Sequence, residues 1–193
     1  LLQQWNAAMA DAVKRGRQAL VLVRDGRAGA GAGTIWHPDG LILTNAHVVK
    51  RRHLEVVLPD GQAKAARIVA HDAAGDVAAL SIEARGLPTI ALGDSRQLRP
   101  GDWVTALGHP WGVLGAATAG TITGVGKQLP EMPRSDRDWI AISLHLRPGH
   151  SGGPLVDAEG RLIGINTMMA GPDVGLAVPV HIVKAFLRRA AGL

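Results

Sequence analysis

The sequence predicts an all-β fold built as two halves. Short apolar runs typical of strands recur at close intervals, separated by turn signals such as those at 37–40 and 157–160. Helical periodicity is confined to the two ends of the chain. Turn residues between Ser95 and Gly101 interrupt the pattern near its middle. These observations favour sandwich or barrel sheets in two similar β halves, although no clear sequence repeat relates the halves.

Each predicted element has a local reason. Apolar residues at helical spacing predict a helix from Trp5 to Gln18, and a second helix from His181 to Ala190. The glycine-rich run 28–33 has no Gly-Lys-Ser or Gly-Lys-Thr after it, so we expect a turn before a strand rather than a phosphate site. The predicted strands are 19–23, 34–36, 41–44, 54–58, 66–70, 77–82, 103–107, 118–123, 140–144, 161–165 and 176–179. We expect an N-terminal helical segment at 1–18, an N-terminal half at about 19–97, a C-terminal half at about 98–180 and a C-terminal helix at 181–193.

Composition excludes several classes of protein. With 47% hydrophobic and 19% charged residues, the chain has an ordinary globular balance rather than a disordered one. The net charge is +5, but the basic residues are scattered apart from 50–52 and 188–189. One Phe and no Tyr leave few rings to stack bases, so we expect no nucleic-acid partner. There is no cysteine, hence no disulfide or thiol chemistry. No membrane anchor is visible, although the chain starts at Leu1, so a removed signal or anchor stays possible.

The stretch from Leu146 to Val156 contains the candidate nucleophile, Ser151. It places this serine among three glycines and between two prolines, which favours a tight, exposed turn leading into a strand. Glycines beside a serine let a substrate backbone approach closely and leave amide N–H groups free to face a developing oxyanion. Taken alone, Ser151 is as typical of an ordinary turn serine as of a nucleophile.

A serine nucleophile needs a general base, and the base needs an orienting acid. His47 is the candidate base because it follows the strand predicted at 41–44, where a turn would place it at the strand end. Asp76 is the candidate acid because it begins an apolar strand, which can draw its carboxylate inward. Taken singly, His47 is more typical of a hydrogen-bonded surface histidine, and Asp76, like Asp72, of a turn or cap.

Three segments together resemble the trypsin-like serine peptidases, specifically the HtrA (Deg) branch. They are Thr-Asn-Ala-His-Val-Val at 44–49, Gly-Asp-Val-Ala-Ala-Leu at 75–80 and Pro-Gly-His-Ser-Gly-Gly-Pro-Leu at 148–155. Further similarity lies at 92–95, 108–112, 164–168 and 175–179, so the resemblance covers about 17–190. It implies two six-stranded antiparallel β-barrels with short terminal helices and an active site in the cleft between the barrels.

The resemblance also implies roles. His47 would act as general base, Asp76 would orient it, and Ser151 would attack the scissile carbonyl, with the amides of Gly149 and Ser151 as oxyanion hole. The chain would be a serine endopeptidase of protein quality control that cleaves unfolded or misfolded polypeptides without cofactor or metal. A homotrimer, and a bacterial periplasmic or other extracytoplasmic location, are further expectations. Members usually carry a PDZ domain after the terminal helix, and we expect none in this chain.

The resemblance predicts a substrate pocket from His145, Ile165, Asn166 and Thr167. His145 lies six residues before the serine, where related folds have the floor of the specificity pocket, so it puts the usual preference for small aliphatic residues in doubt. The alternative that we favour is a core histidine. His150 replaces the usual Asn, and we expect catalysis to survive because its amide is not one of the two oxyanion donors.

Active-site loops of the family often regulate activity by becoming ordered. The equivalent loops here would be 109–115, 128–139, 147–150 and 168–174. Such regulation leaves a rival interpretation open, in which the same fold serves as a latent or non-catalytic chaperone or peptide-binding module.

Two other classes of enzyme fit poorly. The pattern Gly149-x-Ser151-x-Gly153 also fits the nucleophile elbow of α/β-hydrolases, with Asp157 or Asp173 and His181 completing a triad. That elbow needs a helix directly after the serine, and Pro154 and a hairpin pattern follow instead. The eight histidines show no metal-ligand spacing.

Overall fold

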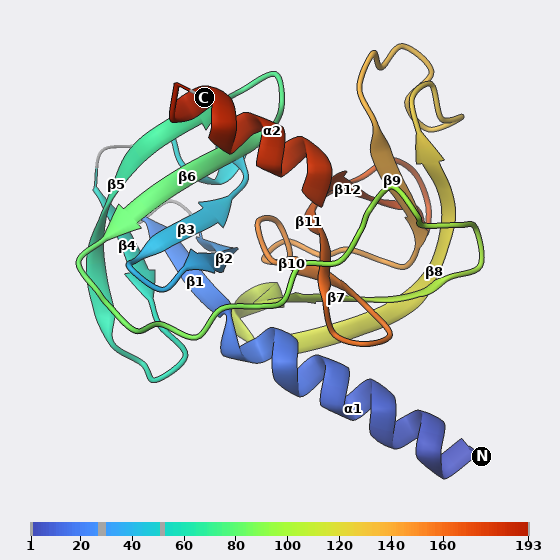
Figure 1. The fold of residues 1–193 in the computed structure, drawn as a ribbon, viewed down its shortest axis with the longest axis horizontal. Helices are drawn as coiled ribbons and strands as arrows, with labels where there is room; N and C mark the ends of the chain where they lie inside the picture. Colours follow the sequence, from blue (N-terminus) through green and yellow to red (C-terminus); the bar gives the residue numbers. More distant parts are fainter. Residues whose placement is uncertain (1, 27–29, 51–52, 193) are drawn as a thin grey trace.

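The computed structural model describes residues 2–26, 30–50 and 53–192. Two closed, six-stranded antiparallel β-barrels stand side by side, with one helix near each end of the chain (Figure 1). The predicted all-β fold of two barrels with short terminal helices is therefore confirmed. Residues 28 and 29 of the glycine-rich run and residues 51 and 52 of the basic cluster lie outside the described residues.

The two barrels have the same strand order. In the first barrel the order is β1-β2-β3-β6-β5-β4, and in the second it is β7-β8-β9-β12-β11-β10. Pairing of β1 with β4 closes the first barrel, and pairing of β7 with β10 closes the second. The first barrel comprises β1 (Leu20–Asp25), β2 (Ala30–His37), β3 (Leu41–Thr44), β4 (Leu54–Val57), β5 (Ala63–Asp72) and β6 (Val77–Ile82). The second comprises β7 (Trp103–Gly108), β8 (Ala116–Gly126), β9 (Trp139–Ser143), β10 (Pro154–Asp157), β11 (Leu162–Met169) and β12 (Gly175–Pro179).

Strand β2 begins earlier than the sequence pattern predicts. We expected residues 28–33 to form a turn, but the strand already starts at Ala30. A Cβ atom at Gly33 would lie 2.9 Å from Val21 Cγ2 and 3.0 Å from Ile42 Cγ2. The glycine is therefore needed because the inward side chains of β1 and β3 fill the space beside β2.

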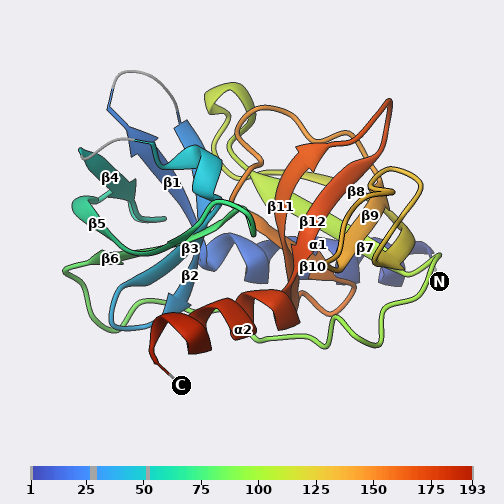
Figure 2. The same ribbon diagram turned by 90° about the horizontal axis from the view of Figure 1, so that it is seen from above.

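Helix α1 packs on the barrel made by the other half of the chain, and helix α2 packs on both barrels. Helix α1 (Leu2–Gln18) contacts β7 and β10 of the second barrel, and it runs outward below that barrel in Figure 1. Helix α2 (Val180–Ala190) contacts β11 and β12 but also β5 and β6 of the first barrel, and Figure 2 shows it lying along one side of both barrels. Among the described residues, no helix is long and apolar enough to cross a membrane.

Trp5 of α1 packs on the second barrel. Its ring meets Trp103 edge to face, with a centroid separation of 5.1 Å and an interplanar angle of 68°. Trp5 nevertheless remains 50% exposed. The tryptophan thus covers part of the chain's own second barrel and still offers apolar surface to a partner.

A buried polar network joins the second helix to two connecting segments. Ser95, in the segment between the barrels, is fully buried, and its hydroxyl lies 2.8 Å from His181 Nδ1 in the first turn of α2. The His181 backbone N–H also donates to Ser95 Oγ, over 3.1 Å. Asp138, at the end of the β8–β9 loop, accepts from His181 Nε2 over 3.1 Å. The start of α2 is therefore fixed to both segments.

Candidate active site

Asp76 lies at the start of β6 in an unusual backbone conformation. Its φ is +50°, a left-handed value that costs free energy for a residue other than glycine. The turn before it is held by Asp72, whose carboxylate accepts the Gly75 backbone N–H over 2.7 Å. The Asn45 side chain donates to the Asp76 carbonyl over 2.8 Å. These contacts maintain the strained conformation and present the Asp76 side chain to the neighbouring turn.

His47 lies opposite Asp76 in the short 3-10 helix η1 (Ala46–Val48), directly after β3. Its Nδ1 is 2.9 Å from Asp76 Oδ2, and its backbone N–H donates to Oδ1 over 3.1 Å. The Asp76 side chain is 11% exposed, whereas that of His47 is 43% exposed. Because an ionised carboxylate only accepts hydrogen bonds, Nδ1 carries the ring proton and Nε2 is left as the basic nitrogen.

Ser151 belongs to the second barrel but contacts the first. Its carbonyl accepts the Ala32 backbone N–H of β2 over 2.8 Å. A Cβ atom at Gly31 would lie 2.8 Å from Val48 Cγ1 and 3.2 Å from the Ser151 carbonyl oxygen. Val48, the residue after His47, and Ser151 therefore both approach Gly31 of β2. The three predicted residues come together where the barrels meet, although they are far apart in sequence.

Gly152 makes this close approach of the barrels possible. Its φ is +87°, and a Cβ atom there would lie 2.1 Å from the Ala32 carbonyl oxygen and 2.3 Å from Thr44 Oγ1. Thr44 in turn donates to the same carbonyl over 2.8 Å. Any side chain at position 152 would push the serine loop away from the first barrel, so the glycine after the serine is a structural requirement.

The Ser151 hydroxyl donates to the Thr167 carbonyl over 2.8 Å. Within the described residues it makes no hydrogen bond to His47. Thr167 is also tied to the other half of the site, because its Oγ1 accepts from the Asn45 side chain over 3.1 Å. Asn45 therefore bridges the Asp76 backbone and Thr167. Sequence reasoning did not single out Asn45, although it lies two residues before the predicted base.

The loop before the serine leaves two backbone N–H groups unused. Gly149 has φ +104°, and a Cβ atom there would lie 2.3 Å from the His109 carbonyl oxygen. Its own carbonyl accepts the His109 backbone N–H over 2.8 Å. In the described part of the chain, the N–H groups of Gly149 and Ser151 donate to no protein acceptor. Two free donors beside a serine hydroxyl are suited to stabilise an oxyanion.

Two buried histidines, His150 and His109, lie in or beside the loop that precedes Ser151. His150 is 2% exposed, and its Nδ1 lies 3.1 Å from the Arg147 N–H within the loop. His109 is 8% exposed, and its Nδ1 accepts the Gly115 N–H over 3.1 Å. Burial lowers the pKa of His150, which a hydrogen bond with the Arg147 backbone partly offsets. Burial also lowers the pKa of His109; the Val21 carbonyl opposes this effect, and His150 reinforces it.

These lowered pKa values predict that acid weakens the folded state. A histidine that is buried in its neutral form gains its proton more readily after unfolding, so its stabilising contribution is complete above pH 6.5 and is lost as the pH falls below that value. We expect the urea midpoint to fall between pH 7.5 and pH 5.5. The fall should be smaller in His150→Asn, because that variant loses one of the two buried titrating rings. Equal falls in both proteins would contradict this account.

His145, predicted as a pocket residue or a core histidine, is neither buried nor part of the core. Its side chain is 57% exposed and lies 3.4 Å from the exposed carboxylate of Asp173. Leu144 and Leu146, on either side, are each 5% exposed and point into the second barrel. Because side chains alternate along an extended segment, His145 faces solvent and the interpretation as a core histidine is wrong.

Two of the other predicted pocket residues, Ile165 and Asn166, are buried rather than open to a substrate. Ile165 is fully buried in the hydrophobic core. Asn166 is fully buried too, and its side-chain amide donates to the carbonyls of Leu107 and Pro154, each over 3.1 Å. Neither side chain is therefore open to a substrate, because both are used to hold β11 in place. Thr167 lies beside Ser151, as described above, and contributes its carbonyl oxygen there.

Comparison with known proteins agrees with this architecture. Residues 31–165 match the family model described as a trypsin-like peptidase domain. The chain is 40% identical over 169 residues to serine protease HTRA1 of Xenopus tropicalis, covering 85% of this chain and 36% of that protein. It is 38% identical over 160 residues to the putative serine protease HhoB of Synechocystis sp., covering 81% of this chain and 38% of that protein.

Solved structures point the same way. An HtrA-type protease, AlgW with tripeptide, superposes with a TM-score of 0.85 at 34% sequence identity, over 93% of this chain and 62% of that one. The chain thus spans less than two thirds of the length of these relatives. It belongs to the trypsin-like serine peptidases, in the HtrA-type branch, as a protease domain.

Proposed function

We propose that the chain is a serine endopeptidase that uses His47, Asp76 and Ser151 as a catalytic triad. The observation that carries the proposal is the pairing of His47 Nδ1 with the Asp76 carboxylate at 2.9 Å, at the junction where Ser151 also lies. This pairing leaves His47 Nε2 as an unprotonated base on the side of the ring away from Asp76. Family membership supports the same assignment.

The proposed reaction is acyl transfer to Ser151 followed by hydrolysis. His47 Nε2 removes the hydroxyl proton as Ser151 Oγ attacks the scissile carbonyl, and the imidazolium is stabilised by Asp76. The amides of Gly149 and Ser151 donate to the oxyanion. His47 then protonates the leaving amine, and water repeats the sequence to release the acid.

One observation favours a second candidate function. The Ser151 hydroxyl donates to the Thr167 carbonyl, so its proton is directed away from His47. For the proposed reaction, this hydroxyl must turn from the Thr167 carbonyl toward His47 Nε2. The same geometry also suits a latent state, in which the domain binds unfolded polypeptides as a chaperone or peptide-binding module without cleaving them.

Labelling with a fluorophosphonate separates the two functions, because this reagent reacts only with an activated serine. We expect labelling of the wild-type protein and of Ser81→Ala, a control serine on β6, and none of Ser151→Ala. Absence of labelling in all three proteins, together with suppressed aggregation of an unfolded client, would instead support the binding module.

We propose unfolded or misfolded polypeptides as the substrate class. An extended chain can enter the junction between the barrels, where the free amides of Gly149 and Ser151 lie, whereas a folded domain cannot present its backbone there. We also propose that the exposed apolar end of α1, with Leu2 82% and Trp5 50% exposed, contributes to a homotrimer contact.

A further inference from the structure

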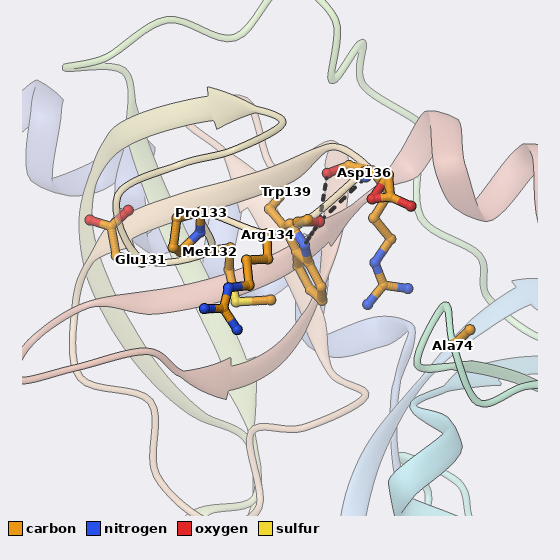
Figure 3. Close-up of a pocket in the computed structure, with 9 residues that line it drawn as sticks. Ala74, Glu131, Met132, Pro133, Arg134, Asp136 and Trp139 are labelled. Carbon is orange, nitrogen blue, oxygen red and sulfur yellow. Dashed lines mark hydrogen bonds between the residues drawn. The ribbon is translucent and has the colours of Figure 1, made fainter.

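A pocket of about 540 Å³ opens beside the candidate triad, between the β8–β9 loop and the β5–β6 turn. Ala74, two residues before Asp76, faces this loop across the pocket, while Trp139 and residues 131–137 line the other side (Figure 3). Trp139 is 1% exposed and is fixed by a hydrogen bond from its ring N–H to Ser135 Oγ, over 2.9 Å. The pocket therefore has a rigid aromatic wall.

Arg137 supplies the charge within this pocket. Its guanidinium carbon lies 4.2 Å from the centre of the Trp139 ring, a cation–π contact that fixes the plane of the group. Ser135 holds the backbone at this point, donating from Oγ to the Arg137 carbonyl over 3.1 Å. The guanidinium is thus already oriented before any ligand arrives, which lowers the entropy cost of binding.

The side chain of Arg137 has no acceptor in the described parts of the chain. It makes neither a hydrogen bond nor an ion pair there, and its Nη1 atom is buried and unpartnered. Burial lowers the Arg137 pKa, and Asp76 and Asp72 partly offset this effect. A guanidinium stays charged in proteins because its intrinsic pKa is very high. A partly buried cation without a hydrogen-bond acceptor is costly, and a carboxylate that enters the pocket would meet the part of the guanidinium that lines it.

The remaining charges of the pocket lie at its outer edge. Glu131 and Asp136 are acidic and Arg134 is basic; Asp136 and Arg134 are exposed, and Glu131 is half-buried. Charges that project into solvent are screened by salt and water, so they influence a bound group less than Arg137 does. Arg137 therefore determines which charge the pocket accepts.

We propose that Arg137 is a specificity-determining residue that binds an acidic side chain of the substrate near the scissile bond. The inference rests on the proposed peptidase function, because it assigns a substrate subsite beside that triad. A planar guanidinium stacked on a ring is suited to bidentate recognition of a carboxylate, and an uncharged amide of the same shape would bind less well.

The test uses paired fluorogenic peptides built on a sequence that the wild-type protein cleaves. Asp and Asn are compared at each of the four positions on either side of the scissile bond. We expect one position at which Asp raises kcat/KM about tenfold or more over Asn, as charge-assisted hydrogen bonds do. Arg137→Gln should bring this ratio close to one, and Arg137→Lys should retain part of it.

Arg188→Gln is the matched control, because it removes the same charge from an exposed site on α2 and should leave the ratio unchanged. The ratio, rather than the absolute rate, is the readout, since Arg137 lies near Asp76. No preference at any position, or a preference that survives Arg137→Gln, would overturn the inference.

Binding of the same labelled peptides to the Ser151→Ala protein provides a second measurement that does not depend on cleavage. The Asp peptide should bind more tightly than its Asn partner, and only when Arg137 is intact. Serine-dependent cleavage without any Asp preference would overturn this inference alone. If no peptide is cleaved and none binds in an Arg137-dependent way, the proposed function and the inference both fail.

Discussion

Replacing Ser151 by alanine is expected to reduce the rate of casein cleavage by about 10⁴-fold or more, since removal of a serine nucleophile leaves only binding and oxyanion stabilisation. The folded state should hardly change. Among the described residues, the hydroxyl makes one hydrogen bond, to the Thr167 carbonyl, whose loss costs about 1 kcal/mol of the free energy of unfolding. Cleavage rates and melting temperatures of the purified proteins test both statements.

His47→Ala should give a loss of similar size, and combining the two changes should add little, because the residues act as one unit. Ser81→Ala serves as the control for the serine substitution and should cleave casein normally. Substantial residual cleavage by Ser151→Ala would refute the assignment of the nucleophile.

Replacing Asp76 by asparagine is expected to lower kcat by about 10⁴-fold while the protein stays folded. The structure explains why this nearly isosteric change is severe. The His47 backbone N–H donates to Oδ1, so the carbonyl oxygen of an asparagine would keep that position. Its amide nitrogen would then face His47 Nδ1 and donate to it. The ring proton would be forced onto Nε2, which could no longer accept the proton of Ser151.

Asp72→Asn is the matched control for this experiment. Asp72 accepts the Gly75 N–H and lies 3.4 Å from Arg189, and an asparagine oxygen can still hold the Gly75 turn. We expect this variant to remain active. Full activity of Asp76→Asn with loss of activity in Asp72→Asn would reverse the roles of the two acids.

The parts of the site that follow from local patterns could be predicted from sequence. A serine among glycines, a histidine after a strand and an aspartate before one each have a local signal, and the alternation of short strands indicates the barrels. The resemblance to HtrA-type peptidases then indicated two six-stranded barrels, where local patterns left open the choice between sandwich and barrel.

The contacts that join distant segments could not be predicted in this way. Asn45 bridges Asp76 and Thr167, which lie 31 and 122 positions away from it. The position of His145 depends on which side of an extended segment faces the second barrel. The φ of +50° at Asp76 is imposed by its neighbours rather than by its own preference. None of these features leaves a periodic trace in the sequence.

Arg137 is a further example of this limit. In the sequence it is one of many scattered basic residues, with no nearby signal that separates it from an ordinary solvated charge. Only the fold stacks it on Trp139 and brings it near Asp76. The proposed role of Arg137 depends on its lack of a hydrogen-bond acceptor among the described residues, and that lack results from three-dimensional packing.

The contacts that the terminal helices make across the two halves of the chain affect how the barrels are held together. Because α1 packs on strands β7 and β10 while α2 reaches β5 and β6, each half of the chain clasps the other. We therefore expect the two fragments to stay associated if the chain is cut between the barrels, because these helix contacts do not depend on that connection. The candidate site, which takes residues from both barrels, would stay aligned under this arrangement even though each barrel closes its own sheet.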